Sequence, residues 1–384
     1  MRRALIAGRF TLALSISAVA ALVGCAQESY YLHRPQSHAP SDAVLPWKPD
    51  APRTLAMFEG DTGRIATWYD LMEGIWWADV VFVGETHTDM AGHRVELAIV
   101  DDTLAAHPGT VVSMEMFERD HQAALDEYLA GTIDLAALIE RAKTRRWEFK
   151  EVPEMKWENS YQPIVDAAKA QGARVVASNA PREFTRIAKS DGYDALRALP
   201  PDKQALFNVP TYVDHGRYRH RFNETMSEEK LAPSAEKSEY DAIFRAQQVW
   251  DATMATSIAR ELDKGAKKVV HIVGQFHVEW RGGIVGQLRA LRPQTKILVV
   301  TIVPDDADEL APDDAGRADV VIYSGKRPEP PTTETSETEP APESTPTPAG
   351  EQPAPSGETP ATDAPSAPAT NPHQPSPHQP PSGG

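Results

Sequence analysis

Short apolar runs alternate with helical patterns along most of the chain. Runs rich in Val, Ile and Phe, typical of buried strands, occupy residues 77–84, 110–117, 173–179, 267–274, 297–303 and 318–323. Helical segments are predicted between them. They cover about 89–106, the stretch that follows the strand at 110–117 and reaches residue 143, a segment that begins at Pro181, and about 234–262. Near-continuous apolar strands separated by helices are typical of a parallel sheet covered on both faces. We therefore predict an α/β fold with a mostly parallel sheet and helices on both faces.

This pattern fails between residues 200 and 233. The stretch is rich in Pro, His, Arg, Tyr and Asn and has no clear period. We predict a helical or irregular insert here, because long excursions from a compact domain are often functional.

The N-terminus has the organisation of a secretory signal peptide. Met-Arg-Arg precedes an apolar run that reaches residue 23, and the only cysteine of the chain is Cys25. The sequence Leu-Val-Gly-Cys at 22–25 resembles a bacterial lipobox, so we expect cleavage of residues 1–24 and lipidation of Cys25. An uncleaved membrane anchor is the alternative, since the run approaches spanning length. Ala26 favours an outer-membrane lipoprotein that faces the periplasm, anchored to the membrane by its N-terminal lipid.

Two polar segments flank the predicted domain, which spans residues 53–326. Residues 25–52 contain five prolines and are predicted to be a lipidated N-terminus and linker. Residues 327–384 are mostly Pro, Thr, Ser, Glu and Ala, and this composition predicts a disordered tail. The residues after Arg327 carry eight carboxylates and no Lys or Arg, so they supply half of the net charge of -16. That acidity, and the lack of a long basic stripe, argue against nucleic acid as a partner.

Polar residues follow the predicted strands at the point where each one ends. The carboxyl ends of parallel strands share one edge of a sheet, where ligands bind. Two histidines and two carboxylates at such an edge can ligate a divalent transition metal, or supply a general base and its orienting partner. Their spacing leaves both roles open. Asp251, in the long helix, is a candidate to orient His277. The residues at the four strand ends are Glu85 and His87, Glu115, Asn179 and Arg182, and Gln275 and His277.

Five of these segments carry a resemblance to a known family. They are Val-Phe-Val-Gly-Glu-Thr-His (81–87), Met-Glu-Met-Phe (114–117), Asn-Ala-Pro-Arg (179–182), Ala-Gln-Gln-Val-Trp-Asp-Ala-Thr-Met-Ala (246–255) and Gly-Gln-Phe-His (274–277). Together they resemble the ChaN-type haem-binding lipoproteins, which are allied to the TIKI and TraB proteins and to the erythromycin esterases. The resemblance covers about residues 60–323. It implies haem as the cofactor, often bound by a homodimer, and a role in iron acquisition, for which an outer-membrane haem receptor is the expected partner.

The insert offers side chains suited to haem. Haem iron takes an axial His, Tyr, Met or Cys, and the propionates pair with arginine. We expect the axial ligand to be Tyr218, with His215 or His220, and the propionates to face Arg217 and Arg221. A solvated basic loop is the alternative interpretation. Three residues at the sheet edge are also assigned to the cofactor: Asn179, Arg182 and Gln275.

Two functions follow from these observations. The first is a membrane-anchored lipoprotein that binds haem at the cell envelope for uptake or storage. The second is a metal-dependent hydrolase of the TIKI or erythromycin-esterase kind. Its divalent ion or activated water would be held by Glu85, His87, Glu115 and His277. The chain has neither a Gly-x-Ser-x-Gly elbow nor a His-Glu-x-x-His helix, so a non-enzyme is favoured.

Overall fold

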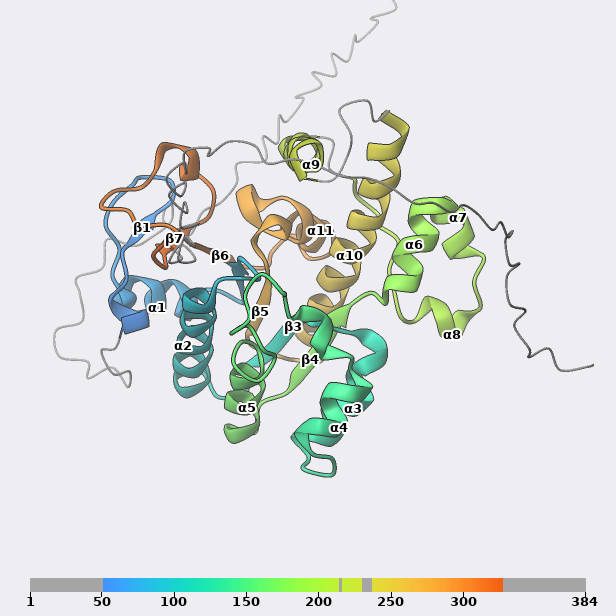
Figure 1. The fold of residues 1–384 in the computed structure, drawn as a ribbon, viewed down its shortest axis with the longest axis horizontal. Helices are drawn as coiled ribbons and strands as arrows, with labels where there is room; N and C mark the ends of the chain where they lie inside the picture. Colours follow the sequence, from blue (N-terminus) through green and yellow to red (C-terminus); the bar gives the residue numbers. More distant parts are fainter. Residues whose placement is uncertain (1–50, 214–215, 230–236, 327–384) are drawn as a thin grey trace, which may run out of the picture. The chain divides into compact units, whose positions relative to one another are not determined.

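The strands lie in one sheet whose edge carries the polar residues described above. The computed structural model describes residues 51–326, apart from 214–215 and 230–236 (Figure 1). In this part of the chain the sheet has seven strands in the order β1-β7-β6-β2-β5-β3-β4. The strands are β1 (Met57–Glu59), β2 (Val80–Glu85), β3 (Val111–Glu118), β4 (Val175–Asn179), β5 (Val269–Gly274), β6 (Ile297–Val303) and β7 (Val320–Tyr323).

Helices connect these strands. The helices that cover the sheet and extend the fold are α1 (Trp68–Trp77), α2 (Met90–Ala106), α3 (Gln122–Leu129), α4 (Leu135–Arg141), α5 (Gln162–Ala170), α6 (Arg182–Ser190), α7 (Gly192–Arg197), α8 (Pro201–Gln204), α9 (Arg217–Glu229), α10 (Lys237–Asp263) and α11 (Gly283–Leu291). Short 3-10 turns occupy Ala51–Thr54, Arg119–His121, Thr144–Trp147, Gln275–His277, Glu279–Arg281 and Pro312–Asp314.

The register of the central strands brings their carboxyl ends level. β2 pairs in parallel with β5 without a break, so that Glu85 lies opposite Gly274. β3 pairs in parallel with β5 and with β4, and its register with β4 shifts between Met114 and Glu118. Only the short β1 runs antiparallel, against β7. The predicted α/β fold with a mostly parallel sheet is therefore confirmed.

Two apolar cores cover the two faces of the sheet, because alternate residues of each strand point to opposite sides. Val81 and Val83 of β2 face a core that includes residues of α1, α2 and α5. Val80 and Phe82 face the other core, together with α10 and α11. Figure 1 shows these two groups of helices on either side of the sheet. The structure thus confirms helices on both faces.

Two elements differ from the pattern expected from the sequence. The strand predicted at 77–84 is β2, which begins only at Val80 because Trp77 is the last residue of α1. The insert contains the helix α9, in which Tyr218, Phe222 and Met226 are buried at a spacing of four residues. The basic and amide residues between these positions hid that stripe in the sequence.

Some predictions fall on other parts of the chain. The signal peptide 1–24, Cys25, the linker up to residue 50 and the tail 327–384 lie outside the described residues. Among the residues that the structure describes, no helix combines the length and apolar character needed to span a bilayer.

Candidate functional site

The ends of β2, β3 and β5 bring three of the predicted side chains together. His87 Nδ1 lies 2.5 Å from Glu85 Oε1. The backbone N–H of Gly274 donates to Glu115 Oε2 over 2.7 Å. A Cβ atom at Gly274 would lie 3.2 Å from His87 Nε2 and 3.5 Å from Glu115 Oε2. The missing side chain of Gly274 therefore leaves the space in which His87 and Glu115 approach one another.

The fourth predicted residue, His277, is held by a buried carboxylate. Its Nδ1 lies 2.6 Å from Asp251 Oδ1 of α10, and its Nε2 lies 3.6 Å from Glu115 Oε1. Asp251 also accepts hydrogen bonds from Tyr218 Oη at 2.7 Å and from Gln248 Nε2 at 3.0 Å. Because a carboxylate only accepts, His277 carries its proton on Nδ1 and directs Nε2 toward Glu115. Asp251 thus orients His277, as the sequence suggested.

Aromatic rings surround the inner side of this cluster. The ring of His87 packs at 5.0 Å from Trp147 and stacks on Phe149 at 6.2 Å. Tyr161 Oη donates to Glu85 Oε1 over 3.1 Å. The side chain of His87 is 31% exposed, whereas that of Glu85 is 1% exposed. His87 is therefore the member of this pair that solvent or a ligand can reach.

The charges at the edge stabilise one another. Burial opposes ionisation of Glu85, but the charge of His87 and the hydrogen bond from it hold the pKa of this carboxyl below its usual value. Burial also opposes the charge on His87, yet Glu85 and Glu115 raise the pKa of that imidazole to about 9. Burial likewise opposes the charge on His277, but Glu115 and Asp251 outweigh it and raise the pKa of this imidazole. The pair of Glu85 and His87 is therefore charged at neutral pH.

Two buried residues of α2, His93 and Glu96, complete the cluster beneath Glu85. His93 Nδ1 lies 3.0 Å from Glu96 Oε2, and His93 Nε2 lies 3.1 Å from the carbonyl oxygen of His87. One ligand atom each from Glu85, His93 and Glu96 lies within 4.8 Å of the others. Burial raises the pKa of Glu96 to about 7, while Glu96 outweighs burial and raises that of His93 to about 9.

The sequence analysis did not select these two residues, although a signal was present. A His and a Glu three positions apart in a helix lie on the same face. The histidine and the glutamate at 93 and 96 stand among apolar residues of the predicted helix, on the face that packs against the sheet.

The three remaining edge residues reinforce the ends of the strands. Asn179 Nδ2 donates to the carbonyl oxygen of Glu115 over 3.1 Å, which ties β4 to β3. The backbone N–H of Arg182 lies 3.3 Å from Glu118 Oε1, and its side chain is exposed. Gln275 Oε1 lies at 3.5 Å from the Thr301 hydroxyl.

The insert residue Tyr218 belongs to this edge cluster. Tyr218 is 3% exposed, and its hydroxyl donates to Asp251. Its ring packs 5.3 Å from Phe276. The hydroxyl is thus committed to the network that holds His277. His215 lies outside the described residues.

The other predicted insert residues of α9 pack on the segment after β5 or face solvent. Arg221 pairs with Glu279 at 2.8 Å and lies 3.7 Å above the ring of Trp280. Arg217 lies over the same ring at 4.5 Å. The side chain of His220 is 74% exposed. His220 therefore faces solvent, whereas Arg221 is held between Glu279 and the ring of Trp280, and its side chain is only 23% exposed.

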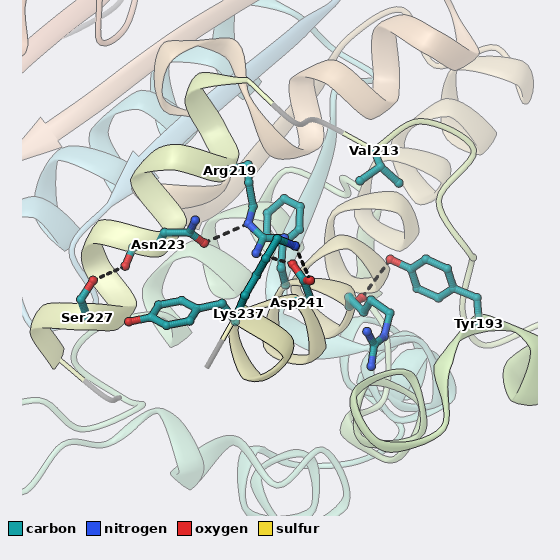
Figure 2. Close-up of a pocket in the computed structure, with 10 residues that line it drawn as sticks. Tyr193, Val213, Arg219, Asn223, Ser227, Lys237 and Asp241 are labelled. Carbon is teal, nitrogen blue, oxygen red and sulfur yellow. Dashed lines mark hydrogen bonds and ion pairs between the residues drawn. The ribbon is translucent and has the colours of Figure 1, made fainter. Parts of the chain in front are cut away.

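A cavity of about 880 Å³ lies on another side of α9 (Figure 2). Arg219 and Lys237 each lie 2.6 Å from a carboxylate oxygen of Asp241 there. Aromatic rings and cationic groups make up much of its wall. The lining residues are Tyr193, Val213, Arg219, Asn223, Ser227, Lys237, Tyr240, Asp241, Phe244 and Arg245.

Comparison with known proteins gives a family and a fold. A model of the family described as haem-binding uptake, Tiki superfamily, ChaN matches residues 71–288. The solved structure of cofacial heme binding to ChaN of Campylobacter jejuni has a TM-score of 0.53 and 20% identity, covering 71% of this chain and 97% of that chain. At this identity the likeness supports the fold alone.

Other solved structures are more distant. The type III effector HopBA1 has a TM-score of 0.40 and 12% identity, covering 72% of this chain and 99% of its own. A mutant of erythromycin esterase EreC has a TM-score of 0.36 and 12% identity, covering 68% and 82%. No curated protein matches the chain.

Proposed function

Because the chain belongs to the haem-binding ChaN family of the Tiki superfamily, we propose that it binds haem and holds it for iron uptake or storage. The observation that carries this proposal is the family match over residues 71–288. The match includes the strand ends that form the edge cluster and the insert that borders the cavity.

The cavity beside α9 has the chemistry that haem requires. Its volume of about 880 Å³ is within the range of small-molecule pockets. Tyr193, Tyr240 and Phe244 offer flat apolar surface for a porphyrin, and arginine and lysine side chains suit its propionates. Arg219 and Lys237 share Asp241, and haem would bring a second anionic partner for them.

Tyr240 is the residue that we assign to the iron. Its hydroxyl has no hydrogen bond with any residue in the described part of the chain, whereas the Tyr193 hydroxyl donates to the carbonyl oxygen of Arg245 at 3.3 Å. A phenolic oxygen is an established type of axial ligand to ferric haem. Tyr218, which the sequence favoured for this role, is bonded to Asp251 instead. Haem, when bound, supplies the iron that is stored or passed on.

Titration with hemin tests this assignment. The purified protein should develop a Soret band at saturation, and Tyr240→Phe should weaken hemin binding at least about tenfold, a loss of about 1.4 kcal/mol. Tyr193→Phe is the matched control. It removes a hydroxyl from the same cavity wall, but that hydroxyl is already hydrogen-bonded to the carbonyl oxygen of Arg245. Its affinity should stay close to that of the wild type. Absence of any Soret change in the wild-type protein would rule out haem binding.

We also propose an envelope location and a haem-linked dimer. The lipobox-like segment ending at Cys25 supports an outer-membrane lipoprotein that faces the periplasm. The cofacial heme binding reported for ChaN of Campylobacter jejuni supports a pair of stacked haems, and the family resemblance supports a homodimer as their holder. Cys25→Ser should move the protein from the membrane fraction to the soluble fraction. Sedimentation should show dimers with hemin, and unchanged mass on adding hemin would contradict the dimer.

A hydrolase remains a second candidate because of one arrangement at the sheet edge. Buried Asp251 fixes the proton of His277 on Nδ1, which leaves Nε2 beside Glu115 to accept a proton from a bound water. A panel of ester and peptide substrates tests this candidate. Turnover that is abolished in His277→Gln and kept in Tyr240→Phe would favour the hydrolase.

A further inference from the structure

The hydrogen bonds of His93 define which of its nitrogens carries a proton. Nε2 lies 3.1 Å from the carbonyl oxygen of His87, and a carbonyl cannot donate, so Nε2 is the donor. In the neutral ring, Nδ1 then has a lone pair, and it faces Glu96 Oε2 at 3.0 Å. Two lone pairs at that distance repel one another unless a proton or a metal ion lies between them.

Unpartnered carboxylate oxygens favour a metal ion over a proton. Glu85 Oε2 and Glu96 Oε1 are buried and have no hydrogen-bond partner among the described residues. Glu85 is 2% exposed, Glu96 is 0% exposed, and His93 is 2% exposed. A buried acceptor without a partner costs about 1–3 kcal/mol, and more when it is charged. The other oxygen of Glu85 is already occupied by His87 and Tyr161.

We propose that Glu85, His93 and Glu96 bind a divalent transition-metal ion beneath the sheet edge. One atom from each residue lies within 4.8 Å of the others. Tetrahedral ligands that surround Zn²⁺ at about 2.0–2.2 Å lie about 3.3–3.6 Å from their neighbours, so His93 Nδ1 and Glu96 Oε2, which are 3.0 Å apart, need to separate by only a few tenths of an ångström to bind the same ion. Two carboxylates and one imidazole suit Zn²⁺, Fe²⁺ or Mn²⁺, and their two negative charges balance the ion.

The surroundings have the features of a supporting shell. A metal-bound histidine commonly donates its other N–H to a backbone carbonyl, as His93 does to His87. Tyr161 donates to Glu85 and packs 4.6 Å from the His93 ring. His87, which contacts Glu85 and whose carbonyl oxygen accepts from His93, has a partly exposed side chain. This metal site is independent of haem binding, since it lies between β2 and α2 and none of its three ligands lines the cavity beside α9.

Zinc binding by the full-length chain tests the proposal. The protein is stripped with EDTA in the absence of haem and titrated with Zn²⁺ against a chromophoric chelator, and its metal content is measured by mass spectrometry. Co²⁺ in place of zinc should give a visible absorption spectrum of a bound ion. The wild type should bind one zinc that Glu96→Gln loses or binds at least about tenfold more weakly. Any zinc that histidines elsewhere in the chain bind is the same in the wild type and in Glu96→Gln, so the difference between the two proteins reports on this site.

Glu115→Gln is the matched control, because Glu115 lies at the same edge but outside the three ligands. It should keep the wild-type affinity. Zinc should also raise the melting temperature of the wild type and of Glu115→Gln, with reversal by EDTA, which does not depend on the folding of Glu96→Gln. The proposal is overturned if zinc and Co²⁺ leave the wild type unaffected, if Glu96→Gln binds as tightly as the wild type, or if Glu115→Gln abolishes binding.

Discussion

The buried His271 makes the stability of this protein depend on pH in a predictable direction. His271 lies within β5, with Nδ1 2.9 Å from the Ser113 hydroxyl and its ring 5.7 Å from Phe82. Burial, helped by the nearby charge of His277, lowers the pKa of His271 from 6.5 to about 3. The unfolded chain takes up this proton as the pH falls through 6.5, but the folded protein does not until about 3. The stabilisation is therefore complete above pH 6.5 and is lost as the pH decreases.

The magnitude follows from the two pKa values. For each pH unit between the two pKa values, the free energy of unfolding falls by about 1.36 kcal/mol. About 2 kcal/mol is therefore lost between a pH of about 7.5 and a pH of about 5. The loss approaches about 5 kcal/mol near a pH of about 3. Urea unfolding of the wild type and of His271→Asn at the two pH values measures this contribution, because asparagine can still bond to Ser113 but does not titrate.

The comparison isolates one residue, since every other histidine is common to both proteins. His271→Asn should be less stable than the wild type at neutral pH, because it loses the ring contact with Phe82. Between the two pH values, its free energy of unfolding should fall by about 2 kcal/mol less than that of the wild type. Equal losses in the two proteins would refute the reasoning, as would an NMR signal of His271 that titrates near 6.5 in the folded state.

Three further predictions concern other buried positions. Asp251→Asn should lower the pKa of His277 in an NMR titration and cost about 3–5 kcal/mol in urea unfolding, and an unchanged pKa would contradict the assigned contact. Gly283→Ala should cost more than Gly316→Ala in the same assay. Both have positive φ, but only at Gly283 would the Cβ lie 2.3 Å from the carbonyl oxygen of His277, so equal costs would contradict the close approach. Burial lowers the pKa of Lys268 to about 8, so the wild type should gain stability relative to Lys268→Met as the pH rises from 8 toward 10.5, and parallel curves would exclude this.

The edge of the sheet was predictable because it depends on local patterns. Apolar runs mark the strands, and parallel strands end at one edge, which places Glu85, Glu115 and His277 near each other without knowledge of distances. The pairing of β2 with β5 in unbroken register then brings these ends level. Asp251 was predicted as a partner of His277 because a long helix must pack against the same sheet.

The residues that we propose for haem binding were harder to predict, because composition does not show which side chains are buried. Tyr218 and Arg219 are neighbours in a segment that reads as a polar loop. Only the winding of α9 turns Tyr218 inward to Asp251 and Arg219 toward the cavity. Tyr240 belongs to the next helix and gained its place in the cavity from the packing of α9 against α10.

The sequence by itself determined the strands, the helices of the α/β body and the polar residues at the sheet edge, because periods of two and 3.6 residues and the choice of residues at strand ends are local properties. Tertiary structure alone decided which of those polar groups contact one another. The pairing of Glu85 with His93 and Glu96 depends on the angle at which α2 crosses the sheet, and the loss of solvent there gives these charges their strength.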